Sequence, residues 1–214
     1  MEPLVTQGDT KNTLTVARLL APEEVRTLLS LFTEIAAEQG WQPGEYLNTA
    51  PEGAVHFALF DNGEPVGGLQ VVLPDTQGRL PCQNVWPEVS LPAACCHGTI
   101  IALRPAYRGH IAHFWWLCQA LWCFCADQGI TTIVLEATPR MVALYKRLGL
   151  PLQIIGELRE HWGEPCQLVS VDTVVVAGAI ALRARRSCLF RQMVLNALQI
   201  ERPSAIVEAR CPAE

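Results

Sequence analysis

Two side chains in this sequence, Tyr145 and His97, are suited by type and position to move protons. Tyr145 lies in the apolar-periodic segment 138–149, which predicts a short helix that ends at Gly149. A phenol with a pKa of about 10 can protonate a departing thiolate when the two groups are aligned. His97 stands where an apolar strand is predicted to begin, and an imidazole titrates near neutral pH. A tyrosine packed beneath a sheet and a partly exposed histidine at a strand start are the structural alternatives.

The segment after that strand has features of a site for an anion or a thioester carrier. Residues 99–103 are apolar, Pro105 turns the chain, and Arg108 and Gly109 begin a predicted helix. A junction of this kind points backbone N–H groups outward, where they can hold an anion. Arg108 would add a contact to a diphosphate or phosphopantetheine, and a structural arginine at the helix start is the alternative.

Composition narrows the classes of protein. The chain has 214 residues, of which 50% are hydrophobic and 17% are charged, so it suits one globular domain with a buried core. Its net charge of −5 gives no electrostatic case for binding nucleic acid or an anionic membrane. The sequence has no apolar run of membrane-spanning length and no recognisable secretory signal. We therefore expect a cytoplasmic protein without stable membrane insertion.

The nine cysteines are an odd number and are scattered through apolar segments. A metal site usually has cysteines in closely spaced pairs, and a disulfide framework needs an oxidising compartment. We therefore expect buried, reduced thiols and no metal. Cys96 and His97 are adjacent, but neighbours on a strand point to opposite faces, which argues against a histidine-activated thiol nucleophile.

The elements that must position these residues follow from periodicity and turn residues. The predicted elements are a strand at 13–20, a helix from Pro22 to Gly40, a hairpin at 54–60 and 65–73 around Asn62-Gly63, a strand at 99–103, a helix at 108–128, a strand at 131–137, the Tyr145 helix, strands at 152–157 and 166–175, and a helix at 177–199. This order predicts an α/β (α+β) protein with a mixed, mostly antiparallel sheet flanked by helices. We expect residues 1–175 to form one domain, with residues 176–214 as a C-terminal helix and tail packed on it.

The two segments resemble the acyl-donor site of the GNAT acyltransferase superfamily, and the element order matches its fold. Arg108 and Gly109 match the start of the family consensus Arg/Gln-x-x-Gly-x-Gly/Ala. Tyr145 and Gly149 match the pattern Asn-x-x-Ala-x-x-x-Tyr-x-x-x-Gly, whose tyrosine usually protonates the leaving thiolate. His97 stands where many members carry a glutamate base.

The resemblance also implies where an acyl donor lies. In the GNAT fold, two central parallel strands splay apart and the pantetheine arm of the donor lies between them. The donor site would then comprise Ile101, Leu103, Arg108, Gly109 and His110. Ile111 and His113 replace the later glycines of the consensus. This replacement favours a donor bound mainly through its pantetheine arm, such as an acyl carrier protein, over a coenzyme A donor bound closely through its pyrophosphate.

Within the superfamily, the chain looks most like the acyl-homoserine-lactone (autoinducer) synthases and the N-acyl amino acid synthases. The resemblance lies in Gly40-Trp41, in residues 61–74 against D-x-G-x-V-V-G-x-x-R-L-L-P, and in residues 146–156. The family arginine of the second stretch is replaced around Gln70, and its Glu-x-Ser-Arg strand aligns with residues 97–100. These replacements favour an amine acceptor different from that of a lactone synthase.

The sequence thus predicts an N-acyltransferase. It would move an acyl group from an acyl carrier protein or acyl-CoA to a small-molecule amine, without a metal. Two alternatives are a degenerate GNAT-like domain that only binds a ligand or partner, and an ordinary acetyl-CoA-dependent N-acetyltransferase. The C-terminal helix could cap the domain or pair with a second subunit in a homodimer.

Overall fold

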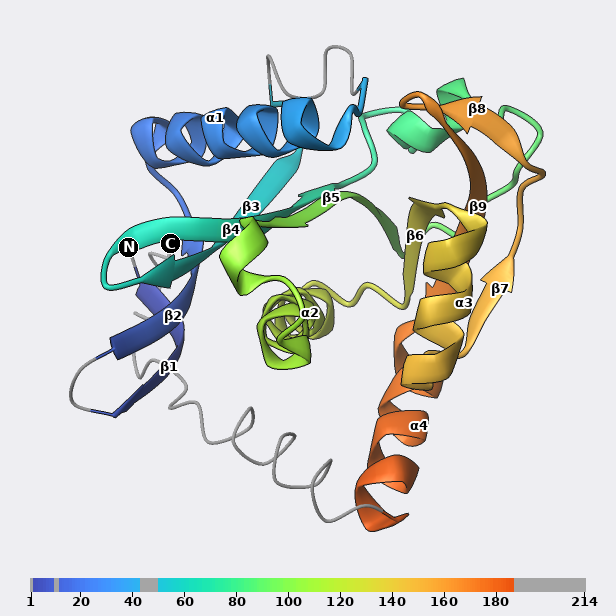
Figure 1. The fold of residues 1–214 in the computed structure, drawn as a ribbon. Helices are drawn as coiled ribbons and strands as arrows, with labels where there is room; N and C mark the ends of the chain where they lie inside the picture. The colour runs from blue at the N-terminus through green and yellow to red at the C-terminus, as the bar shows by residue number, and fades with distance from the viewer. Residues whose placement is uncertain (1, 10–11, 43–49, 187–214) are drawn as a thin grey trace, which may run out of the picture.

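The computed structural model describes residues 2–9, 12–42 and 50–186 (Figure 1). Its strands and helices follow the predicted order, with two additional strands, one at 2–9 and a short one at 159–161. The elements are β1 (Glu2–Asp9), β2 (Asn12–Leu19), α1 (Pro22–Gln39), β3 (Ala54–Asp61), β4 (Glu64–Val72), β5 (Cys95–Leu103), α2 (Ile111–Asp127), β6 (Thr132–Ala137), α3 (Pro139–Leu148), β7 (Leu152–Ile154), β8 (Arg159–His161), β9 (Glu164–Asp172) and α4 (Thr173–Arg186), with short 3-10 turns at Pro81–Asn84 and Pro105–Tyr107.

One sheet organises the molecule. Its strand order is β1-β2-β3-β4-β5-β6-β9-β7, and β8 pairs with β9 outside this path. Every pairing is antiparallel except that of β5 with β6. The predicted mixed, mostly antiparallel sheet flanked by helices is confirmed.

Helices cover both faces of the sheet. Figure 1 shows α1 on one face of β3, β4 and β5, and α2 on the other. Leu28 and Phe32 of α1 are buried in one core, and Leu117 and Phe124 of α2 belong to a second core on the opposite face. β3 and β4 are therefore covered on both sides, which explains why nearly all of their residues are buried.

Several predicted boundaries differ from the structure. The helix at 108–128 begins at Ile111, because Pro105–Tyr107 form a separate 3-10 turn first. The strand predicted at 152–157 ends at Ile154. The last helix begins at Thr173 rather than at 177. The Asp172 carboxylate stands just before this helix and accepts hydrogen bonds from the backbone N–H groups of Val174 and Val175. The rest of that prediction, residues 187–199, and the predicted tail lie outside the described residues.

A prediction about packing arises at Gly156, which lies against a buried tryptophan. A Cβ at this position would lie 2.6 Å from Cδ1 of Trp86 and 2.8 Å from Cβ of Leu168. Trp86 is fully buried and donates a hydrogen bond to the Glu157 carbonyl. Replacing Gly156 with Ala should therefore lower the free energy of unfolding by about 1–3 kcal/mol, measured by denaturant titration.

The matched control for this variant is Gly178→Ala. A Cβ at Gly178, in α4, would meet no atom within 4 Å. The control should leave stability unchanged or raise it, because alanine is the better helix former. Equal unfolding midpoints for Gly156→Ala and the unmodified chain would show that the contact with Trp86 is not tight.

Candidate active site

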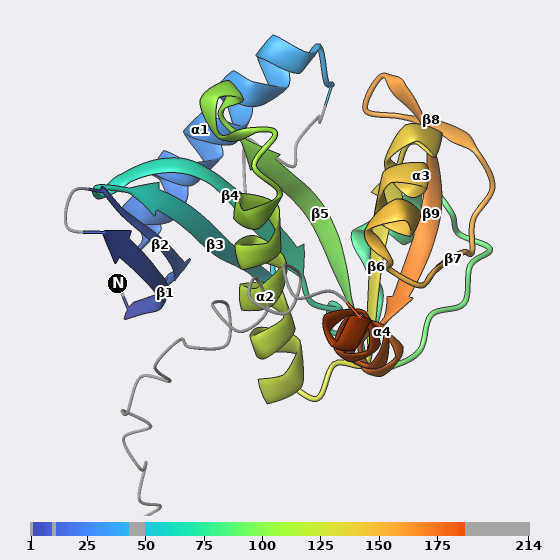
Figure 2. The same cartoon turned by 60° about the horizontal axis from the view of Figure 1, so that its bottom comes forward.

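The sheet opens between β5 and β6. The two strands pair in parallel only through residues 95–98 and 132–135. Just beyond, a bulge shifts the register between β4 and β5, so that Gln70 pairs with Ile100 and Val71 with Gly98. Figure 2 shows β5 and β6 diverging from their closed end, which lies near α4. Past the four paired positions, no backbone hydrogen bonding joins the two strands.

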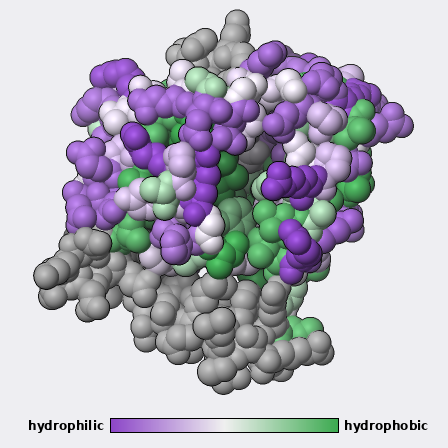
Figure 3. All heavy atoms as spheres, viewed as in Figure 1, coloured by the Kyte–Doolittle hydropathy of each residue, from purple (hydrophilic) through white to green (hydrophobic). Residues whose placement is uncertain are grey.

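A cavity of about 400 Å³ occupies this opening. Its wall includes side chains from α2 and α3 on one face of the sheet, and from the end of α1, from β8 and from β9 on the other. The cavity therefore passes through the sheet between the separating strands. In the space-filling view, apolar residues gather in a hollow near the centre of the face that Figure 3 presents.

The part of the cavity on the α2 and α3 face is apolar, and we call it the apolar half. Its lining consists of aromatic and aliphatic side chains, among them Ile101, Phe114, Trp115, Cys118, Trp122, Met141, Tyr145, Leu152 and Val176. Burial raises the pKa of the Cys118 thiol to about 12, so this thiol stays protonated near neutral pH. Such a surface suits a hydrocarbon chain better than a small polar group.

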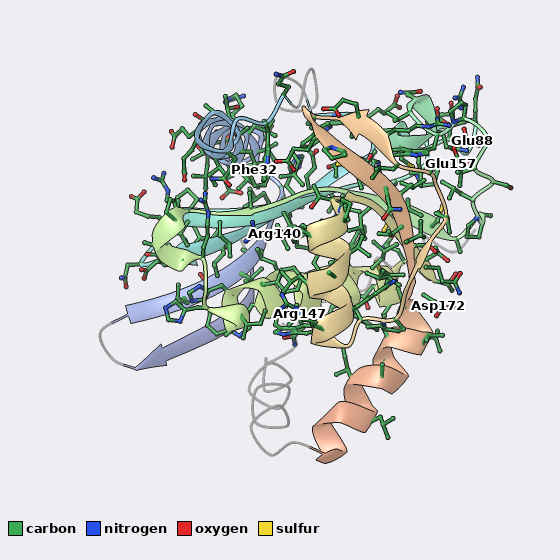
Figure 4. All side chains as sticks on the ribbon, turned by 45° about the vertical axis from the view of Figure 1, so that its right-hand side comes forward. Phe32, Glu88, Arg140, Arg147, Glu157 and Asp172 are labelled. Carbon is green, nitrogen blue, oxygen red and sulfur yellow. The ribbon has the colours of Figure 1, made fainter. Side chains whose placement is uncertain are left out.

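The part on the α1 and β8 face carries polar and aromatic side chains, and we call it the polar half. Its lining includes Gln39, Trp41, Thr99, Glu136, His161, Trp162 and Glu164. Arg140 also lines the cavity, from the first turn of α3 (Figure 4).

Glu136 joins two histidines at the border between the halves. Its Oε2 lies 2.7 Å from Nε2 of His97, and its Oε1 lies 3.7 Å from Nε2 of His161. Burial alone would raise the pKa of the Glu136 carboxyl, but the charge of His97 and the hydrogen bond to it act in the opposite direction, and the pKa is lowered. An ionised carboxylate only accepts hydrogen bonds, so Nε2 of His97 carries the donated proton.

His161 is held as a neutral base beside the cavity. Burial lowers the pKa of its imidazole, and the nearby Glu136 carboxylate only partly opposes this effect. A neutral imidazole next to a carboxylate can accept a proton, and the carboxylate then stabilises the imidazolium that forms.

The structure places Tyr145 in the cavity wall, as a proton donor would require. The Thr138 side chain caps α3 by accepting a hydrogen bond from the N–H of Met141, and Pro139 follows Thr138. Gly149 ends the helix with a left-handed φ of 85°.

The surroundings of the Tyr145 ring keep its hydroxyl protonated. The ring stacks on Phe114, with centroids 5.8 Å apart. Burial and the nearby Cys118 raise the pKa of the phenol, so it keeps its proton near neutral pH.

His97 does not lie where direct proton transfer would require. Its side chain is only 1% exposed and is not part of the cavity wall. It contacts Glu136 instead, so its geometry suits a residue that positions the carboxylate.

The predicted donor residues are only partly brought together. Ile101 lines the cavity, whereas Leu103, Gly109 and His110 do not. Arg108 lies outside it as well: its Nε donates to the Leu103 carbonyl, and its guanidinium forms an ion pair with Glu38 of α1 at 2.9 Å. This arrangement matches the structural alternative for Arg108. Gly109 adopts a left-handed φ of 87°, and His110 precedes the first residue of α2.

A chain of buried polar side chains lies behind Thr99. The Thr99 hydroxyl donates to Oε1 of Gln70 at 2.7 Å, and Nε2 of Gln70 lies 2.9 Å from Nε2 of His56. Gln70 is fully buried and His56 is 3% exposed. Burial lowers the pKa of His56 to about 4, so this imidazole is neutral at pH 7.

This burial predicts a loss of stability in acid. The pKa of His56 is about 4 in the folded chain against an ordinary value of 6.5, so the unfolded chain binds a proton that the folded chain excludes. The stabilisation is fully present above pH 6.5 and is lost as the pH falls towards 4. At ~1.36 kcal/mol per pKa unit, the loss is on the order of 3 kcal/mol.

The measurement is the free energy of unfolding from denaturant titrations at pH 7 and pH 4.5. A His56→Gln variant should show a smaller loss between the two values, because every other titrating group is shared. Equal pH dependence in both proteins would contradict the assignment of this loss to His56.

Sequence reasoning missed Glu136, His161 and Thr99. Glu136 gave one usable signal, because it is a charged residue inside an otherwise apolar strand. No local feature of the sequence indicated His161, because its position beside Glu136 depends on the pairing of β9 with both β6 and β8.

Other kinds of site find no support in residues 2–9, 12–42 and 50–186. Within these ranges, no group of three or more His, Cys, Asp and Glu side chains could hold a metal ion. No helix there is long and apolar enough to cross a membrane. Five of the cysteines, Cys82, Cys95, Cys96, Cys125 and Cys166, are buried thiols.

Known proteins match this chain by structure only. No family model and no curated protein matches the sequence. The structure of FeeM, an N-acyl amino acid synthase from uncultured soil microbes, is similar with a TM-score of 0.67 and 16% identity, over 80% of this chain and 96% of FeeM. BjaI, a CoA-dependent acyl-homoserine lactone synthase solved with SAM and isopentyl-CoA, gives 0.59 and 16%, over 75% and 83%. Escherichia coli ElaA gives 0.56 and 15%, over 74% and 99%.

Identities this low establish the fold and not the reaction. The likeness covers most of each chain and includes both kinds of synthase that the sequence resembles. The described chain therefore has the fold of the GNAT acyltransferase superfamily.

Proposed function

We propose that this protein is an N-acyltransferase that moves a medium or long acyl group from a thioester to a small-molecule amine. The observation that carries this proposal is the cavity that passes through the sheet between β5 and β6, apolar on one face and polar on the other. An acyl chain fits the apolar half and an amine fits the polar half, so the thioester carbonyl would lie between the separating strands.

The chemistry requires two proton transfers. The amine nitrogen attacks the thioester carbonyl carbon, and His161 accepts one amine proton while Glu136 stabilises the imidazolium. The tetrahedral intermediate then collapses, the carbon–sulfur bond breaks, and Tyr145 donates its proton to the thiolate. His97 holds the Glu136 carboxylate in place through the 2.7 Å hydrogen bond.

The lining of the apolar half favours a longer acyl group over acetyl. The apolar half presents three aromatic side chains of α2, namely Phe114, Trp115 and Trp122, which a two-carbon group would not cover.

The ion pair of Arg108 with Glu38 bears on the identity of the donor. Because the Arg108 guanidinium already has an anionic partner, this pair favours a donor bound through its pantetheine arm over one bound through its pyrophosphate. An acyl carrier protein is therefore the expected donor, and acyl-CoA is the alternative.

The test pairs acyl-CoA and acyl-carrier-protein donors, with chains from acetyl to dodecanoyl, with a panel of amino acids and other amines. Products are identified by mass spectrometry, which is also applied to small molecules that accumulate in cells making the protein. We expect an N-acyl product with a medium or long chain. Acetylation alone would indicate an ordinary N-acetyltransferase, and the absence of any product would favour a non-catalytic binding domain.

A further inference from the structure

In the polar half, the hydroxyl group of Thr99 already donates its hydrogen to another side chain. Thr99 donates its hydroxyl hydrogen to Oε1 of Gln70 at 2.7 Å, while its side chain also forms part of the cavity wall. A hydroxyl group has a single hydrogen and two lone pairs. Toward the cavity, Thr99 Oγ1 can therefore only accept a hydrogen bond.

The residues behind Thr99 fix this polarity. The amide nitrogen of Gln70 only donates, so Nε2 of His56, 2.9 Å away, must be the unprotonated acceptor nitrogen. His56 is 3% exposed and neutral at pH 7, which makes it the Nδ1–H tautomer. The direction of donation runs from Thr99 to Gln70 to His56, and reversing it would require turning a fully buried amide.

Thr99 also lies at the place where the reaction would occur. The last residues paired between β5 and β6 are Gly98 and Leu135. Thr99 and Glu136 come next on the two strands, so they flank the opening on either side. Both belong to the cavity wall.

We propose that Thr99 selects primary amines by accepting the second N–H of the attacking nitrogen. This inference rests on the proposed acyl transfer. When a primary amine forms the new carbon–nitrogen bond, one of its protons goes to His161 and the other remains on nitrogen. Thr99 Oγ1 accepts that remaining N–H. A secondary amine or an alcohol gives its only proton to the base and leaves Thr99 without a donor.

The experiment measures kcat/KM for the best primary amine from the acceptor panel and for its N-methyl derivative, in the unmodified protein, Thr99→Val and Thr99→Ser. A buried N–H left without an acceptor should lower kcat/KM for the primary amine by about 10-fold to 100-fold in Thr99→Val. Thr99→Ser keeps the acceptor oxygen and should stay within about threefold of the unmodified protein. The N-methyl amine should lose much less in Thr99→Val, because it has no second N–H.

The results separate this inference from the proposed function. If the unmodified protein acylates no amine, the proposed function fails and the inference fails with it. If it acylates amines but Thr99→Val lowers both substrates equally or neither, selection by Thr99 is wrong while the acyltransferase proposal stands.

A second measurement does not depend on turnover. Imidazole ¹⁵N NMR of the histidine-labelled protein should show His56 as the Nδ1–H tautomer, assigned by comparison with His56→Gln. An Nε2–H tautomer would mean that the Gln70 amide is reversed and that Thr99 can donate into the cavity, which overturns the inference.

Discussion

Replacing Glu136 with Gln is expected to lower kcat by about 10²–10⁴-fold while the protein stays folded. Glutamine can still accept the hydrogen bond from Nε2 of His97, so the buried histidine keeps a partner. The neutral amide cannot stabilise a positive charge on His161, 3.7 Å from the present carboxylate. The effect should therefore appear in the proton-transfer step and not in folding, which circular dichroism and thermal unfolding would check.

The pH dependence gives this variant a sharper signature. The Glu136 carboxylate raises the pKa of His161 against the larger, opposing effect of burial. Removing the carboxylate should move the acid limb of the kcat/KM profile to lower pH. Glu164→Gln is the control. Glu164 also lines the cavity, but the ion pairs of His97 and His161 are formed with Glu136 and not with Glu164. If both variants had the same rate and pH profile, the role of Glu136 would be disproved.

Replacing Tyr145 with Phe should also lower kcat by about 10²–10⁴-fold, because the thiolate then leaves without its proton donor. Phenylalanine keeps the ring that stacks on Phe114, so stability should change little. A thioester whose thiol has a low pKa, such as an aryl thioester, needs no proton on departure. That donor should restore most of the lost rate, and an unchanged rate with the ordinary donor would remove Tyr145 from the mechanism.

Tyr107→Phe is the matched control for this variant. The Tyr107 hydroxyl donates a 2.5 Å hydrogen bond to Asp61 and is not part of the cavity wall. We expect the control to lose stability and to keep its turnover, which is the reverse of the Tyr145 result.

The fold was largely predictable because its elements begin and end at residues with local effects. Pro22 and Gly40 bound α1, Asn62 and Gly63 form the β3–β4 turn with left-handed φ angles of 50° and 89°, and Gly149 ends α3. None of these signals depends on residues far away in the sequence. The same locality explains why the helix that carries Tyr145 was predicted, because its start and its end both follow from one short segment.

The polar half was not predictable for the opposite reason. Glu136 and His161 come together only when β6 and β8 both pair with β9. His97 was predicted as a base at the start of its strand, and its contact with Glu136 could not be foreseen because that partner lies 39 residues away in the sequence. Arg108 likewise depends on Glu38, a partner on a distant helix.

The cavity that crosses the sheet has a consequence for how a product would leave. In the proposed reaction, the amide product has its hydrocarbon tail in the apolar half and its head group in the polar half, so it is threaded between β5 and β6. Withdrawing it toward α1 strips the tail from its aromatic contacts, and withdrawing it toward α2 desolvates the head. Longer tails should therefore dwell longer, and product departure rather than bond formation would limit turnover for the longest chains.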